Sequence, residues 1–215
     1  MKYACPLPAY LINRYHGWKA TSYKDNRGWY RRLAEDGQHP RSMVISCCDS
    51  RVNVTSIFEA DAGEFFIHRN IANLVPPFDP DGQHHGTSAA VEYAVTGLKV
   101  AHLIVVGHSG CGGVEGCYNM CAGNAPELED SSSFVGRWME ILRPGYADLP
   151  EGDDETRKRV LEKASVVISL ENLMSFPFVK TAVESERLSL HGLWNDIGEG
   201  IIEAYDPKTA AFKPI

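Results

Sequence analysis

Short apolar runs alternate with helical patterns along the chain. The runs at residues 42–47, 64–68, 102–107 and 166–170 have the length of β-strands. The first of them is unalternating and apolar, which is typical of a buried strand in a parallel sheet. These runs therefore predict four central strands.

Between these runs, apolar residues recur at helical spacing. In residues 87–97, for example, Ala90, Val91 and Ala94 fall on one helical face. Further helices are expected at residues 52–60, 112–122, 134–142 and 154–164, and from the fourth strand to about residue 183 with an interruption at Pro177. Strands that alternate with helices indicate an α/β fold with a mostly parallel central β-sheet flanked by helices.

The two ends of the chain differ from this pattern. Residues 1–36 are rich in aromatic and basic side chains and predict an N-terminal helical arm, which either packs on its own domain or lies across a partner subunit. Residues 188–194 alternate partly and can pair with residues 200–205, which predicts a C-terminal strand extension. A chain of 215 residues suits one domain, so we expect a single domain with the arm at 1–36 and the α/β core at 37–215.

Composition and charge narrow the classes of function. The net charge of -7 argues against a nucleic-acid partner, because phosphate binding needs clustered cations. No apolar run reaches the length of a membrane span, and the N-terminus has no basic start followed by an apolar stretch, so we expect neither a membrane partner nor a secretion signal. A chain of this size does not need disulfides, so its six cysteines favour metal or thiol chemistry in a reducing compartment, and we expect a cytoplasmic protein.

Two of the four runs end in reactive side chains. Residues 47–51 (CCDSR) follow the first run, and residues 108–113 (HSGCGG) follow the third. In parallel sheets the binding crevice lies beyond the carboxyl ends of the strands, so we expect these two segments to meet. Their donors, Cys47, His108 and Cys111, suit Zn(II) and leave one coordination position open, as in catalytic zinc sites.

Other interpretations of these donors stay open at this point. A single His-x-x-Cys is a weak signal, and buried cysteines are often small hydrophobic residues. Asp49 and Arg51 strengthen the metal interpretation, because the arginine fork can hold and orient an ionised carboxylate beside a metal. The same pair could be a structural ion pair, and Asp49 could itself bind the metal.

These motifs resemble the Cys-x-Asp-Ser-Arg and His-x-x-Cys-Gly-Gly signatures of the β-class carbonic anhydrases. Cys48 falls on the variable position of the first signature. The resemblance extends over most of the chain, through residues 63–73 (GEFFIHRNIAN), 91–95 (VEYAV) and 191–198 (HGLWNDIG).

The resemblance implies a zinc-dependent, reversible hydration of CO2 to bicarbonate and a proton by a zinc-bound hydroxide. It implies one Zn(II) per subunit, held by Cys47, His108 and Cys111, with Asp49 and Arg51 as catalytic residues. It also implies a substrate pocket formed by Gln38, Phe66, Tyr93 and a backbone N–H of the turn at Gly112.

Further properties of the family apply to this chain as expectations. Val44 stands where a bicarbonate-regulated type carries a tryptophan, so the plant-like, non-regulated type is expected. The family forms dimers with the pocket at the subunit interface, so a homodimer or a higher homo-oligomer, such as a tetramer, is expected. Four histidines are candidate proton shuttles, and no motif distinguishes among them: His39, His68, His84 and His85.

Three alternative functions remain. A COS or CS2 hydrolase would use a similar zinc site, although the presence of Gln38, Phe66 and Tyr93 favours CO2. A zinc-stabilised binding protein that has lost catalysis is disfavoured by the Asp49–Arg51 pair. A thiol redox enzyme would need a resolving cysteine pair, which the adjacent Cys47 and Cys48 do not supply.

Overall fold

The computed structural model describes residues 4–82 and 85–215. It divides into two compact units, one that ends at His39 and one that runs from Pro40 to Ile215. The expectation of a single domain with an arm at residues 1–36 stays a prediction.

The N-terminal unit consists of three helices, α1 (Ala9–Ala20), α2 (Ser22–Asp25) and α3 (Arg27–Asp36), none of which buries a residue. Its aromatic side chains contact one another, as in Trp18–Tyr23 at 5.2 Å and Trp18–Tyr30 at 5.8 Å between ring centroids. The helices predicted for this part of the chain are present. Their apolar side chains, among them Tyr10 and Tyr15, remain exposed to solvent.

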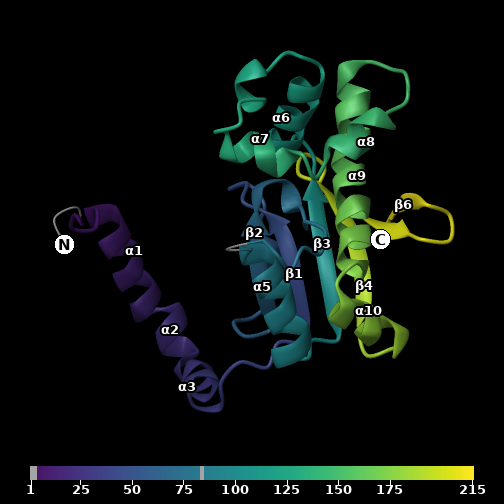
Figure 1. Cartoon of the computed structure of the whole chain (residues 1–215). Coiled ribbons are helices and arrows are strands. Elements are labelled where there is room, and N and C mark those ends of the chain that lie inside the picture. The colour runs from purple at the N-terminus through teal and green to yellow at the C-terminus, as the bar shows by residue number, and fades with distance from the viewer. Residues whose placement is uncertain (1–3, 83–84) are drawn as a thin grey trace. The chain divides into compact units, whose positions relative to one another are not determined.

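The larger unit is organised around one six-stranded sheet with the order β2-β1-β3-β4-β5-β6 (Figure 1). Its strands are β1 (Ser42–Cys47), β2 (Phe65–Asn70), β3 (His102–His108), β4 (Ser189–Asp196), β5 (Ile201–Asp206) and β6 (Ala211–Pro214). The first four are parallel, and β5 and β6 join them as antiparallel strands. The α/β fold with a mostly parallel sheet is confirmed, and so is the pairing of the two C-terminal segments.

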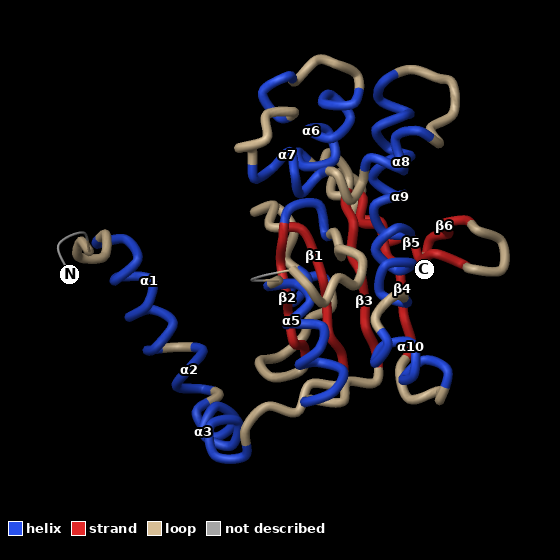
Figure 2. The backbone as a smooth tube through the Cα atoms, viewed as in Figure 1, coloured by secondary structure: helices blue, strands red, loops and turns tan. Residues whose placement is uncertain are grey.

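The longer helices of this unit lie on one face of the sheet and beyond its carboxyl edge (Figures 1 and 2). The face carries α5 (Gly86–Glu92), which continues as a π-helical turn (Tyr93–Gly97), together with α9 (Asp154–Met174) and α10 (Pro177–Glu184). Beyond the carboxyl edge lie α6 (Gly112–Cys121), α7 (Phe134–Met139) and α8 (Arg143–Ala147). The short helix α4 (Val54–Ile57) contributes Val54 to a smaller apolar cluster with Val44, Val106 and Leu193.

The strand predicted at residues 166–170 is wrong, because these residues lie inside α9. The helix is capped by Asp153, whose side chain accepts a hydrogen bond from the N–H of Thr156, and it continues without a break from Asp154 to Met174. Its buried residues, such as Leu161, Ser165 and Ser169, recur at helical spacing. The helix is therefore long and buried along one side, and a short apolar run inside it resembles a buried strand in sequence.

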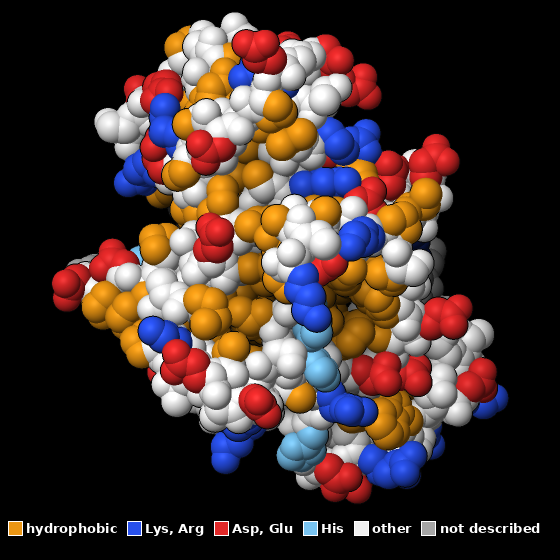
Figure 3. Space-filling view, turned by 90° about the vertical axis from the view of Figure 1, so that its right-hand side faces the viewer, with side chains coloured by type: hydrophobic (Ala, Val, Ile, Leu, Met, Phe, Trp, Pro, Cys, Tyr) orange, Lys and Arg blue, Asp and Glu red, His pale blue; other side chains and the backbone are white. Residues whose placement is uncertain are grey.

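The surface carries charges of both signs. On the face shown in Figure 3, acidic and basic side chains are interspersed with hydrophobic ones, and histidines lie near its middle.

Among the described residues, no single helix is long and apolar enough to cross a membrane, and only α9 and α10, which are bent by 90° at their junction, meet that criterion when taken together.

Candidate metal centre

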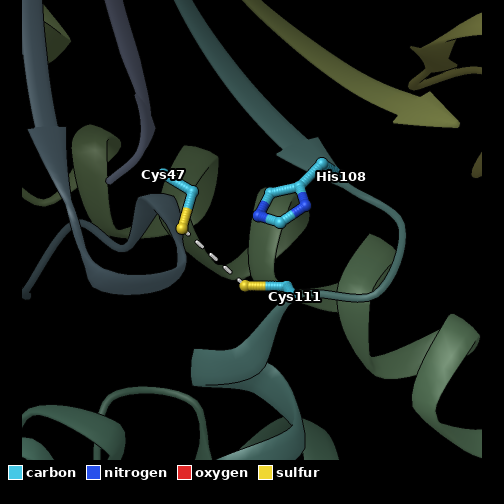
Figure 4. Close-up of side chains that lie close together, drawn as sticks. All are labelled: Cys47, His108 and Cys111. Carbon is cyan, nitrogen blue, oxygen red and sulfur yellow. Dashed lines mark hydrogen bonds between the residues drawn. The ribbon is translucent and has the colours of Figure 1, made fainter. Parts of the chain in front are cut away.

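Two neighbouring strands bring the predicted metal ligands together. Cys47 is the last residue of β1 and His108 is the last residue of β3. The two strands are parallel, with Ser46 opposite Val106, so both end at the same edge of the sheet. After His108 the chain turns back, and Cys111 occupies the position just before α6. The three side chains converge beyond the strand ends (Figure 4).

The geometry of the three donors fits a metal ion. Their sulfur and nitrogen atoms all lie within 4.8 Å of one another, and all three residues are buried. His108 Nδ1 lies 3.0 Å from the carbonyl oxygen of Ser109, to which it can donate. His108 Nε2 is buried without a hydrogen-bond partner in the described chain, and a ring nitrogen held in this way is ready to accept a metal. Two thiols and one imidazole form the donor set of a three-ligand zinc site.

The two thiols interact directly with each other. Their sulfur atoms lie 3.9 Å apart. This contact lowers the pKa of Cys47 to about 4, and it raises the pKa of Cys111. The contact therefore favours the thiolate form of Cys47 over that of Cys111. Because thiolates are the metal-binding form, one sulfur is already prepared to bind a cation and the other would lose its proton on binding.

A fixed carboxylate stands beside the three donors. Arg51 donates from Nε to Asp49 Oδ1 at 2.9 Å and from Nη2 to Asp49 Oδ2 at 2.7 Å. These hydrogen bonds hold the pKa of the Asp49 carboxyl well below its usual range. Asp49 Oδ2 lies 4.0 Å from His108 Nε2. Asp49 is therefore ionised, oriented by Arg51 and adjacent to the three donors.

Arg69 fixes the segment that carries Cys47 and Asp49, a role that sequence reasoning missed. Its Nε donates to the Cys47 carbonyl at 2.8 Å, and its Nη2 donates to the carbonyls of Asp49 and Val52 at 2.7 and 2.8 Å. The sequence did carry a signal, because Arg69 lies in the 63–73 segment of the family resemblance. One guanidinium on β2 therefore sets the path of the turn after β1.

Hydrogen bonds from β4 and α9 fix the segment between His108 and Cys111. Gly110 has a φ of 63°, a left-handed conformation that favours glycine. Ser109 is fixed by the end of β4, because its N–H donates to the Asn195 carbonyl and its hydroxyl accepts from the N–H of Ile197, both at 2.9 Å. The buried carboxylate of Glu162 accepts from the N–H groups of Gly110 and Cys111. Burial raises the pKa of this carboxyl, although these hydrogen bonds oppose the shift.

The predicted pocket residues do not all lie beside the metal ligands of their own chain. Phe66 and Tyr93 contact each other, with ring centroids 5.8 Å apart. Phe66 pairs with Met43, four residues before Cys47, and so lies part-way down the sheet from the metal centre. Gln38 belongs to the N-terminal unit. Gly112 is the first residue of α6, where the leading N–H groups of a helix have no partner within the helix.

A cavity of about 480 Å³ lies next to Cys48, the neighbour of Cys47 in the chain. Its apolar wall includes Ile71, Pro76, Phe134, Val135 and Trp138, and its polar wall includes His68, Asn70, His85 and Thr87. The His68 Nε2 atom lies 2.9 Å from the Thr87 hydroxyl, and burial lowers the pKa of His68. The cavity therefore joins an apolar surface to several polar side chains, next to the residue that follows Cys47.

The other candidates from the sequence lie elsewhere. His39 is in the N-terminal unit, and His84 lies outside the described residues. Cys5 is exposed, and Cys117 and Cys121 lie on α6, with the Cys117 thiol donating to the Met139 carbonyl at 3.7 Å. None of these three cysteines belongs to the described metal-binding group.

Comparison with known proteins identifies the family. The family model described as carbonic anhydrase matches residues 42–202. The chain is 35% identical over 193 residues to beta carbonic anhydrase 3 of Arabidopsis thaliana, which covers 88% of this chain and 73% of that protein.

Solved structures give the same result. The β-carbonic anhydrase CcaA is similar with a TM-score of 0.86 and 30% identity, over 96% of this chain and 91% of that one. A tetrameric β-carbonic anhydrase from Sordaria macrospora is similar with a TM-score of 0.74 and 32% identity, over 91% of this chain and 94% of that one.

Proposed function

The chain belongs to the β-class carbonic anhydrases, and on that premise we propose that it catalyses the zinc-dependent, reversible hydration of CO2 to bicarbonate and a proton. The observation that carries this proposal is the convergence of Cys47, His108 and Cys111, with donor atoms within 4.8 Å of one another. The ion pair of Asp49 with Arg51, beside these donors, adds a group that can orient a nucleophile.

Cys47, His108 and Cys111 would hold one Zn(II) per subunit and leave a fourth position open. A bound Zn(II) lowers the pKa of a water that it coordinates and so supplies hydroxide near neutral pH. The hydrogen bond of His108 Nδ1 with the Ser109 carbonyl keeps the ring oriented with Nε2 toward the two sulfurs. Arg69 holds the turn after β1 that carries Cys47, and Glu162 holds the turn after β3 that carries Cys111, so the donor geometry is largely formed in advance.

Asp49 would orient the nucleophile. Its carboxylate can accept the hydrogen of the attacking oxygen, which leaves a lone pair directed at the carbon of CO2. Arg51 binds both carboxylate oxygens, and this favours a position in which Asp49 faces the site without binding the metal itself. A backbone N–H at Gly112 can donate to the oxygen on which charge develops.

The cavity beside Cys48 offers CO2 an approach along apolar side chains. CO2 is apolar and needs few polar contacts, and Ile71 and Trp138 line this space. His68 and His85 lie on the same wall and are candidates to carry the released proton to solvent.

A second copy of the chain would complete the pocket. Phe66 and Tyr93 contact each other with tilted rings, Phe66 lies part-way down the sheet from its own metal centre, and Tyr93 is 52% exposed. Their position is explained if they line the pocket of a partner subunit. The aromatic side chains of α1 are exposed, and a partner subunit would cover them. These features support a homodimer or a higher homo-oligomer, and the Sordaria macrospora relative is tetrameric.

The direct test measures metal content and CO2 hydration on the same purified protein. We expect one zinc per chain and rapid hydration that is lost when a chelator removes the metal. COS and CS2 hydrolysis are assayed in parallel. Faster turnover of COS or CS2 than of CO2 would assign the site to the alternative hydrolase, and bound zinc without turnover would leave only a structural metal.

A further inference from the structure

Glu162 is a carboxylate in a position that an apolar residue would normally occupy. It lies on the buried side of α9, between Leu161 and Ser165, and is 5% exposed. Burying a carboxylate is costly unless other groups compensate it. Its contacts therefore indicate why it is there.

The Glu162 side chain binds the turn that leads to Cys111. Its Oε1 accepts from the N–H of Gly110 at 2.6 Å and from the N–H of Cys111 at 3.3 Å. Its Oε2 is buried without a hydrogen-bond partner in the described chain, and Arg159 Nε lies 3.8 Å away from this atom. One oxygen thus carries both contacts to the turn.

The peptide group between Gly110 and Cys111 is held at both ends. Its N–H donates to Glu162, and its carbonyl accepts from Arg51 Nη2 at 2.8 Å. The same Arg51 nitrogen donates to Asp49. A continuous set of hydrogen bonds therefore runs from α9 through the ligand-bearing turn to the Asp49 carboxylate.

We propose that Glu162 is a positioning residue for the metal centre: by accepting two hydrogen bonds, it sets the place of Cys111 relative to Cys47 and His108 and aligns the Gly110 carbonyl with Arg51. The inference rests on the proposed metal centre. Groups that orient metal ligands typically change metal affinity by about 10-fold to 100-fold when they are removed. The alternative is a purely structural role, in which Glu162 stabilises the fold without affecting the metal ligands.

Three substitutions of Glu162 separate position from charge. Glu162→Gln keeps an oxygen at the same reach, whereas Glu162→Asp keeps the charge but shortens the side chain, and Glu162→Ala removes both. Leu173→Ala is the matched control, because Leu173 is fully buried on the same helix and belongs to the apolar cluster away from the metal centre.

The readout is Co(II) binding, measured by visible absorption and by competition with a chelator. We expect Glu162→Ala and Glu162→Asp to weaken Co(II) binding by about 10-fold to 100-fold and to change the spectrum, whereas Glu162→Gln stays close to the wild type. Leu173→Ala should lower the melting temperature and leave affinity and spectrum unchanged.

Wild-type affinity and spectrum in Glu162→Ala would overturn the inference, and so would a Glu162→Gln variant that binds as poorly as Glu162→Asp. If Glu162→Ala does not fold, the Co(II) affinities and spectra of Glu162→Gln and Glu162→Asp are sufficient to test the inference. A wild-type protein that fails to bind Co(II) would instead overturn the metal centre itself, so the two failures are distinguishable.

Discussion

Arg51 binds both carboxylate oxygens of Asp49, through Nε at 2.9 Å and Nη2 at 2.7 Å, although Arg51 is itself half exposed to solvent. The carboxylate is thereby fixed with Oδ2 4.0 Å from the free nitrogen of His108. A surface ion pair of this kind contributes little to stability. Its role is instead to hold the carboxylate in one orientation.

Replacing Asp49 with Asn should lower kcat/KM for CO2 hydration by about 10²-fold to 10⁴-fold, the range typical of a positioned acid-base group. Asn offers one acceptor oxygen in place of two, so it cannot keep both bonds from Arg51. Metal content should stay at the wild-type level. Asp79→Asn, in an exposed loop, serves as the control. Wild-type turnover in Asp49→Asn would contradict the role of this carboxylate.

Replacing Cys47 with Ser should abolish stable metal binding and lower CO2 hydration by more than about 100-fold, since losing a ligand costs more than losing a group that orients one. Zinc is measured by elemental analysis of the dialysed protein, alongside stopped-flow hydration. Cys48→Ser provides a closely matched control, because Cys48 is adjacent in sequence but exposed. If both variants kept their zinc, Cys47 would not be a ligand.

CO2 hydration should rise with pH through the alkaline range. Asp49 does not titrate there, because Arg51 holds its pKa well below the usual range. Two thiolates also leave less positive charge on the metal than three histidines do, so the bound water should be less acidic than the value of about 7 found with three histidines. Stopped-flow rates across the range test this directly, and a profile that is flat between about pH 6 and pH 9 would contradict it.

Mixing two inactive or impaired variants should restore activity if Tyr93 serves the metal centre of a partner. A hybrid of Cys47→Ser with Tyr93→Ala would contain one site with intact ligands and an intact Tyr93. Random assortment of equal amounts should give about a quarter of the wild-type rate, because half of the dimers would be hybrids with one complete site. Mixtures that show only the average of the two parents would place Tyr93 at its own metal centre.

The stability of the fold should fall at mildly acidic pH through His68. Burial lowers its pKa below the ordinary value of 6.5, so the unfolded chain binds this proton at a higher pH than the folded chain does. The contribution of neutral His68 is therefore complete above about pH 6.5 and is lost as the pH falls through the lowered pKa. The difference in melting temperature between pH 8 and pH 5.5 should be larger for the wild type than for His68→Gln. His16→Gln, on the exposed α1, serves as the control. Equal divergence would exclude His68 as the cause.

Strands β1 and β3 and the metal ligands could be predicted because the apolar run that predicts each strand leads directly into ligand side chains. An apolar run that ends in Cys47 and another that ends in His108 define both the strands and the edge at which they meet. The run at 166–170 misled because a five-residue stretch with four apolar residues suits a strand and a buried helix equally well, and only the continuous helix from Asp154 to Met174 decides between them.

The groups that hold the site were harder to predict. Glu162 stands in a charged stretch of sequence, where a glutamate is normally exposed, and only the packing of α9 on the sheet reveals its burial. The pocket residues raise a different difficulty. Sequence can indicate that Phe66 and Tyr93 belong to a pocket, but it cannot say whose metal centre they face.

The pairing of β1 with β3 also bears on how the protein folds. The ligands come from strands that are neighbours in the sheet but are separated in the chain by β2 and α5. Bringing such distant segments together is slow, because the intervening chain must lose entropy before the contacts form. The colour of bound Co(II) should therefore appear late in refolding, as a signal that the middle of the sheet has closed, whereas α1 and the β5–β6 hairpin can form from local contacts without producing it.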